Sequence, residues 1–112
     1  MTFRILPAVL AAFVSASAFA RDATPAEIEL IRSAMAEKLK DAESARFLDV
    51  KLLEQFTVCG KVNSKNSYGA YAGYTAFMGL IFAESNTAIV VGIDEAGKDI
   101  VASICKDKGY SG

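Results

Sequence analysis

The stretch CGKVNSKNSYGAYAGYTAF, residues 59–77, sets the main constraint on how this chain folds. Aromatic residues recur there at every third position from Tyr68 to Phe77, with glycines between them. Successive side chains of a β-strand point to opposite faces, so a spacing of three places aromatic residues on both faces of a sheet. Asn, Ser and Gly at residues 63–69 favour a turn, because their side chains bond the backbone or permit left-handed conformers. We therefore predict a turn and then a strand over residues 70–83.

Three further segments complete the predicted sheet. Apolar and polar residues alternate over residues 47–54 and again over residues 56–63, which indicates two strands joined by a short connection. Residues 87–93 are rich in β-branched side chains and are apolar on both faces, so we expect a strand that is central in the sheet or covered on both sides. With residues 70–83, these segments predict a four-stranded, mainly antiparallel sheet.

A helix is predicted before the sheet. Thr24 is placed to cap it, Pro25 suits its first position, and Glu27 completes a capping box. Apolar residues then recur at spacings of three and four as far as Leu39. We expect a helix over residues 25–41 that packs its apolar face on the sheet.

The C-terminal segment is compatible with two structures. A helix within residues 95–108 is favoured by acidic residues at its start, lysines near its end and Gly109 just after it. The β-branched residues within 100–105 favour a fifth strand instead. We favour a short helix and keep the strand as the alternative.

Residues 1–20 have the pattern of a secretory signal peptide. Arg4 precedes an apolar segment, and small residues lead to the cleavage sequence AFA at residues 18–20. The apolar segment is short for a membrane-spanning helix, which needs about twenty residues. We expect cleavage after Ala20, leaving residues 21–112 as a single small α+β domain. This product would be periplasmic or secreted, without stable membrane insertion.

The chain has two cysteines, Cys59 and Cys105. In an oxidising compartment an even pair allows a single connectivity, so we predict a disulfide that ties the C-terminal segment to the sheet. Two buried free thiols are the alternative. A redox role is not expected, because the sequence contains no C-x-x-C.

The absence of histidine restricts the chemistry of the chain. It excludes a Ser-His or Cys-His nucleophile pair, an imidazole base and the usual zinc sites. We expect no enzyme activity, no cofactor and no metal. The formal net charge of −1 and the lack of charge runs do not indicate nucleic acid as a partner. Paired carboxylates leave a weak, glycosidase-like hydrolase as an alternative, with these candidates: Asp49, Glu54, Glu84, Asp94, Glu95 and Asp99.

The function predicted instead is non-catalytic binding of an envelope component or a protein partner. Tyrosine offers an apolar body with a polar tip, and lysines and asparagines at the strand entry would add a cationic, amide-rich lip. The candidate binding residues are Lys61, Asn63, Lys65, Asn66, Tyr68, Tyr71 and Tyr74. One alternative is that the C-terminal helix covers the tyrosine face. Another is a structural or stress-related envelope protein with no defined ligand.

The same stretch resembles the core of an uncharacterised family of small exported proteobacterial proteins. Residues 58–77 match a VCGxVNxKNxxGxYxGxxxF-like motif, and LKDAESARF at residues 39–47 is similar to a preceding LKDPxSAxF segment. Ala42 stands where proline is usual in that segment. The resemblance implies export, a helix-plus-sheet domain and a C-terminal cysteine corresponding to Cys105. It implies no known activity.

Overall fold

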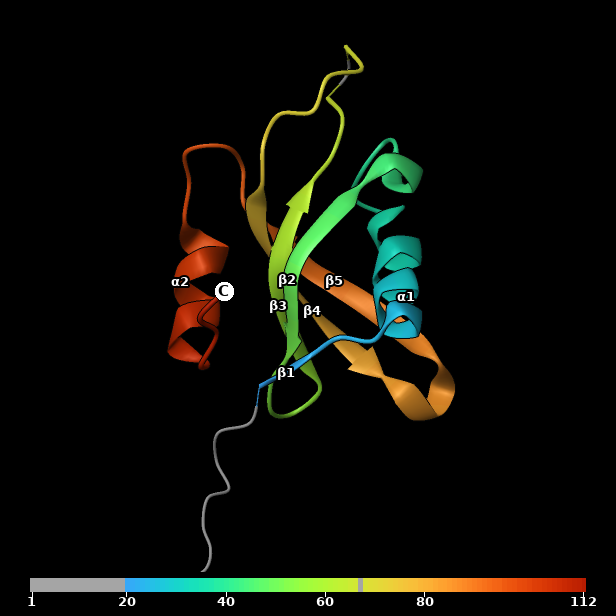
Figure 1. Cartoon of the computed structure of the whole chain (residues 1–112), viewed down its shortest axis with the longest axis vertical. Helices are drawn as coiled ribbons and strands as arrows, with labels where there is room; N and C mark the ends of the chain where they lie inside the picture. Colours follow the sequence, from blue (N-terminus) through green and yellow to red (C-terminus); the bar gives the residue numbers. More distant parts are fainter. Residues whose placement is uncertain (1–19, 67) are drawn as a thin grey trace, which may run out of the picture.

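The computed structural model describes residues 20–66 and 68–112, so nearly all of the predicted signal peptide lies outside the described residues. The chain forms a five-stranded antiparallel sheet in the order β1-β2-β3-β4-β5. Figure 1 shows one helix, α1, on one face of this sheet and a second, α2, on the other. The predicted α+β class is confirmed, with one strand more than the four predicted.

The elements follow one another along the chain with short connections, except for the long β3–β4 loop. Their bounds are β1 (Arg21–Asp22), α1 (Pro25–Met35), the 3-10 helix η1 (Ala42–Ser44), β2 (Arg46–Leu52), β3 (Thr57–Asn63), β4 (Thr75–Phe82), the 3-10 helix η2 (Ala83–Ser85), β5 (Thr87–Ile93) and α2 (Ile100–Asp107). In the described part of the chain, no helix is long and apolar enough to cross a membrane.

Helix α1 begins as predicted, with the complete capping box between Thr24 and Glu27. It ends at Met35, so the prediction that it reaches residue 41 was wrong. The segment after it folds back on the helix, where the guanidinium of Arg32 donates to the carbonyl oxygen of Ala45 at 2.6 Å. This hydrogen bond fixes the end of the connection, just before β2, against α1.

The main core lies between α1 and the sheet. Ile31 and Met35 of α1 are fully buried in it, together with Phe77 of β4. The ring of Phe77 meets that of Phe47 edge to face, with centroids 5.8 Å apart. Gly60 lies against this pair and leaves room for it. A Cβ atom at this position would be only 2.9 Å from the ring of Phe77.

The C-terminal segment is helical, and the alternative strand was wrong. The reason is the buried carboxylate of Asp94, which accepts hydrogen bonds from the backbone N–H groups of Val101 and Ala102 at 2.8 and 2.9 Å. Such bonds satisfy donors that a helix start leaves without partners. The predicted disulfide is confirmed: Cys59 of β3 is joined to Cys105 of α2. A second, smaller core surrounds the disulfide.

Strand β4 begins at Thr75, so the prediction of strand from residue 70 was wrong. Residues 64–66 and 68–74 belong to a loop, in which Gly69 and Gly73 have positive φ angles of 82° and 109°. Backbone of that kind does not continue a strand, and glycine adopts it without steric cost. The three tyrosines of the motif therefore do not alternate across the sheet.

Candidate binding pocket

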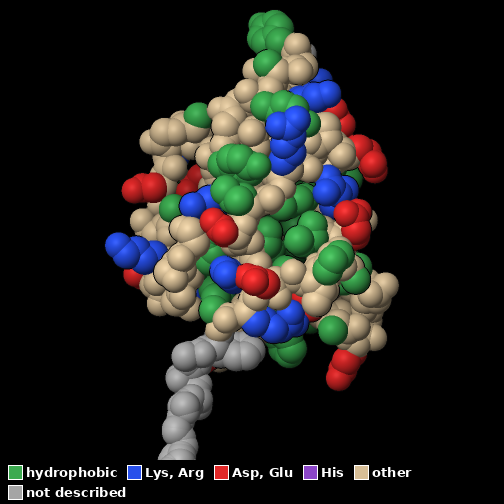
Figure 2. All heavy atoms as spheres, in the orientation of Figure 1, with side chains coloured by type: hydrophobic (Ala, Val, Ile, Leu, Met, Phe, Trp, Pro, Cys, Tyr) green, Lys and Arg blue, Asp and Glu red, His purple; other side chains and the backbone are tan. Residues whose placement is uncertain are grey.

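The structure gives the three predicted tyrosines different surroundings. Tyr68 lies near the tip of the loop and is 93% exposed, and Tyr74 is 44% exposed. This loop projects beyond the sheet in Figure 1, and Figure 2 shows hydrophobic side chains at the protruding tip. Tyr71 instead anchors the loop: its hydroxyl donates to the carbonyl oxygen of Ser44 at 2.9 Å. The guanidinium of Arg46 lies 3.8 Å from the centre of its ring.

The asparagines of the predicted amide-rich lip make hydrogen bonds to the loop itself. Asn63 is buried, and its side-chain oxygen accepts from the N–H of Gly73 at 2.9 Å. The side-chain oxygen of Asn66 accepts from two backbone N–H groups of the turn. The ammonium of Lys65 lies 5.8 Å from the ring centre of Tyr71, and Lys61 is half-buried on β3. Both asparagines therefore shape the loop.

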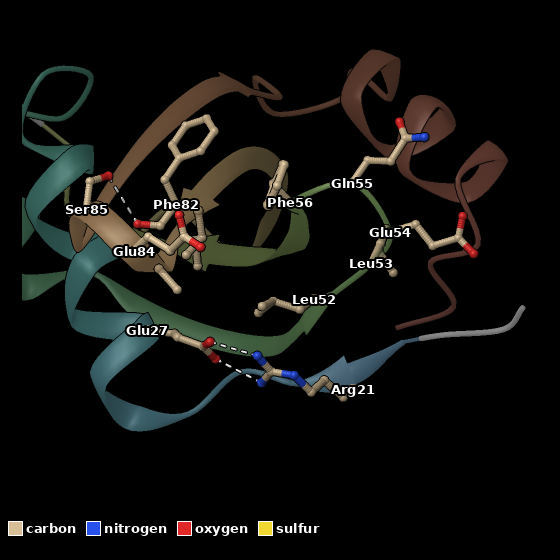
Figure 3. A pocket seen from close by; sticks show the side chains of 12 residues that line it. Arg21, Glu27, Leu52, Leu53, Glu54, Gln55, Phe56, Phe82, Glu84 and Ser85 are labelled. Carbon is tan, nitrogen blue, oxygen red and sulfur yellow. Dashed lines mark hydrogen bonds and ion pairs between the residues drawn. The ribbon is translucent and has the colours of Figure 1, made fainter. Parts of the chain in front are cut away.

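A pocket of about 780 Å³ lies at the opposite end of the sheet, and Figure 3 shows it from close by. It is formed by β1, the start of α1, the β2–β3 turn, the end of β4 and η2. Its apolar lining comes from Leu52, Phe56, Ile81 and Phe82, among others. The volume falls within the range of about 300 to 1,000 Å³ common for small-molecule sites.

The turn between β2 and β3 holds an aromatic residue in an unfavourable backbone conformation. Gln55 and Phe56 have φ angles of 60° and 66°, and the N–H of Thr57 donates to the carbonyl of Glu54 at 3.2 Å. Two successive left-handed residues make a type I′ turn, which normally contains Asn-Gly. Each such residue with a side chain costs about 1 to 2 kcal/mol. The sequence predicts a short connection here but gives no sign of the turn type or of the pocket, because Gln-Phe is not a typical turn pair.

Phe56 is exposed despite this cost. The residue is 63% exposed, and its ring centre lies 5.6 Å from that of Phe82. In Figure 3 the two rings stand along the same side of the pocket. Strained backbone of this kind persists where the surrounding structure enforces it, and it clusters at binding sites.

The opposite wall of the pocket carries an ion pair, Arg21 and Glu27, whose charges offset each other. The guanidinium of Arg21 donates to both carboxylate oxygens of Glu27, at 3.0 and 2.8 Å, as drawn in Figure 3. Glu27 also accepts from the backbone N–H of Thr24 at 2.9 Å. These bonds, the one from Arg21 foremost, lower the pKa of Glu27 from 4.5 to about 2. Glu27 therefore stays ionised, and Arg21 offsets its charge.

Two other carboxylates line the pocket, those of Glu54 and Glu84. Figure 3 shows Glu84 projecting over the pocket from η2, whereas Glu54 extends away from it. Within residues 20–66 and 68–112, Glu84 takes part in no ion pair. The charge offered to a ligand is therefore negative. No group of three or more His, Cys, Asp or Glu in that part of the chain is placed to hold a metal ion.

Acid should weaken the fold through Glu27. Its pKa is lower in the folded chain, so its contribution is complete above about pH 4.5 and is lost as the pH falls towards 2. We expect this group to account for a loss of about 1 kcal/mol, less than the full shift implies because Arg21 is half exposed. Urea unfolding at a series of acidic pH values measures it. Glu27→Gln should remove this part of the slope and Arg21→Gln should reduce it; identical slopes in all three proteins would contradict the assignment.

No family model, curated protein or solved structure matches the chain. The resemblance to exported proteobacterial proteins therefore stays a prediction. The proposals below depend on the geometry of the pocket and on the chemistry of the residues that line it.

Proposed function

We propose that this protein is an exported, non-catalytic binding module. Its pocket takes the apolar side chain or ring of a ligand that also carries a positive charge, as part of an envelope component or a partner protein. The observation that carries the proposal is Phe56, an exposed aromatic residue held at the pocket in a left-handed conformation. A residue that costs stability and buries little of its own surface is best accounted for by contact with something outside the chain.

The lining supports an apolar ligand body. Leu52, Ile81 and Phe82 supply an apolar surface beside the ring of Phe56. An aromatic ligand ring inserted there would gain about 0.5 to 1.5 kcal/mol from ring packing, beyond the burial of its apolar area. The open shape suits a side chain or ring presented by a larger molecule.

The charge of the rim supports a cationic ligand end. Arg21 and Glu27 neutralise each other, which leaves Glu84 as the carboxylate that projects over the pocket. A carboxylate beside an apolar surface favours an ammonium or guanidinium group and disfavours an acid.

Export is supported by the disulfide and by the predicted signal peptide. Cys59 and Cys105 are buried and bonded to each other, which is compatible with an oxidising compartment. The weak hydrolase stays an alternative prediction, although Asp94, one of its candidate carboxylates, is already engaged at the start of α2.

Three indole probes of different charge test the pocket: tryptamine, tryptophol and indole-3-acetate. Titrations followed by NMR should shift signals of pocket residues, with the cation binding best and the anion worst. Glu84→Gln should abolish the advantage of tryptamine over tryptophol and leave tryptophol unchanged. Shifts centred on Tyr68 and Tyr74 would move the binding site back to the predicted tyrosine surface. Absence of binding by every probe would count against this pocket.

Replacing the two residues of the strained turn should raise the stability of the fold and weaken ligand binding. The double variant Gln55→Asn, Phe56→Gly relieves two left-handed positions and loses one aromatic contact, so we expect about 1 kcal/mol of added stability. The same variant should bind tryptamine about tenfold more weakly, since the ring that packs on the ligand is gone. Gln55→Asn alone is the matched control, which should gain stability and keep binding. Unchanged affinity in the double variant would refute the role of Phe56.

A further inference from the structure

We propose that a second copy of this chain pairs along the free edge of β5, so that two sheets join across a two-fold axis. Strand β5 stands at the end of the strand order, and among the described residues it pairs with β4 alone. An edge strand points alternate backbone N–H and C=O groups away from its sheet, ready to bond to another strand. Residues 87–91 do not line the pocket, so the proposal is independent of the proposed function.

The composition of β5 contains little that would prevent pairing at this edge. Residues 85–93 contain no charged residue and no proline, two of the features that commonly protect sheet edges from pairing, and the register irregularity lies towards one end of the strand. Ile89 and Val91 are 54% and 49% exposed, although both belong to the β-branched class that packs well in sheets. The edge therefore combines open backbone groups with exposed apolar side chains.

Pairing of this strand with itself is geometrically consistent. An antiparallel pair centred on Ile89 sets each Ile89 opposite its counterpart and each Ala88 opposite Val90, so the two members of every pair lie on the same face of the joined sheet. A two-fold dimer uses the same patch on both copies, and an uncharged patch brings no like charges together. The register irregularity in β5 after Val90 ends the regular run. The paired segment is therefore short, and the association should be reversible.

A groove lies beside the edge, and the charge of its rim is compatible with a second copy. The groove has a volume of about 360 Å³ and lies between residues 88–90 of β5 and the C-terminal end of α1 with the turn that follows. Glu37 and Lys38 are exposed at its rim. An acid and a base side by side leave this rim without net charge, so the rims of two copies do not repel each other.

Measurement of mass as a function of protein concentration tests the proposal, by analytical ultracentrifugation of the purified chain. We expect a reversible monomer–dimer equilibrium. Ile89→Glu should raise the dimer dissociation constant by about tenfold or more, because the two new carboxylates face each other. Leu48→Glu is the matched control: Leu48 is 42% exposed on β2, opposite Lys61, and its replacement should leave the equilibrium unchanged.

Amide hydrogen exchange of the unmodified protein gives a second measurement that does not depend on a variant folding. Exchange in residues 87–91 should slow as concentration rises, while exchange in β2 should not change. A chain that stays monomeric at every concentration overturns the proposal. So does a dimer that Ile89→Glu leaves intact, one that Leu48→Glu disrupts equally, or one whose β5 amides are not protected. A monomer that accepts a foreign strand at β5 overturns the choice of partner.

Discussion

Replacing Cys59 and Cys105 together by alanine should lower the free energy of unfolding by about 4 kcal/mol. The disulfide closes a loop with a sequence separation of 46 residues, and a cross-link of that span removes much of the conformational freedom of the unfolded chain. Domains of this size are stable by only about 5 to 15 kcal/mol, so the loss is a large fraction of the total. Helix α2 has eight residues, too few to be stable without the sheet beneath it.

Urea unfolding of the wild type, the reduced wild type and the alanine variant measures this effect. The reduced protein and the variant should agree, since both lose the same cross-link. Tyr110 donates its hydroxyl to the carbonyl of Asp49 at 2.8 Å, so the NMR signals of Tyr110 report locally on release of α2. Two free thiols in the denatured, unreduced protein, or a loss below about 1 kcal/mol, would contradict the assignment.

Gly79→Ala should destabilise the fold by about 3 kcal/mol, the upper part of the range for overpacking. A Cβ atom at this position would lie 2.6 Å from the carbonyl oxygen of Ile89 on the neighbouring strand. That atom belongs to the backbone of β5, so relief requires the two strands to separate where their register already shifts. A flexible side chain would move aside at lower cost.

Gly92→Ala is the matched control for this prediction. Its nearest neighbour would be a methyl group of Val101 at 3.3 Å, which belongs to a side chain of α2 and has room to adjust. In thermal and urea unfolding, the free energy of unfolding of Gly79→Ala should be well below that of Gly92→Ala. Equal stabilities would show that the β4–β5 pairing tolerates a methyl group at Gly79, contrary to the geometry.

The features that sequence predicted well are those whose cause is local. The start of α1 follows from Thr24 and Glu27, which bond to each other's backbone within one turn. Strand β5 follows from its run of β-branched residues and has the predicted bounds. The prediction that it is central in the sheet or covered on both sides was wrong, because β5 is an edge strand on which Ile89 and Val91 are exposed. The disulfide follows from a cysteine count that allows one pairing.

The features that sequence predicted poorly depend on distant contacts. Strand β1 has two residues, too few for any periodicity, and exists because it pairs with Leu52 and its neighbour on β2. The loop before β4 reads as strand by composition, but Asn63 and Tyr71 hold it through bonds to Gly73 and Ser44. The partners in these bonds are ten and twenty-seven residues apart, beyond the reach of a local pattern.

The sequence by itself determined the class of fold, the start of the first helix, the cysteine pair and the absence of histidine chemistry. These depend on residue type and on spacing within a few positions. The tertiary structure alone decided where the candidate site lies. The candidate site is a pocket beside Phe56, at the other end of the sheet from the predicted surface of Tyr68, Tyr71 and Tyr74. The physical reason is that a pocket is a gap between elements far apart in the chain, and only their packing brings its walls together.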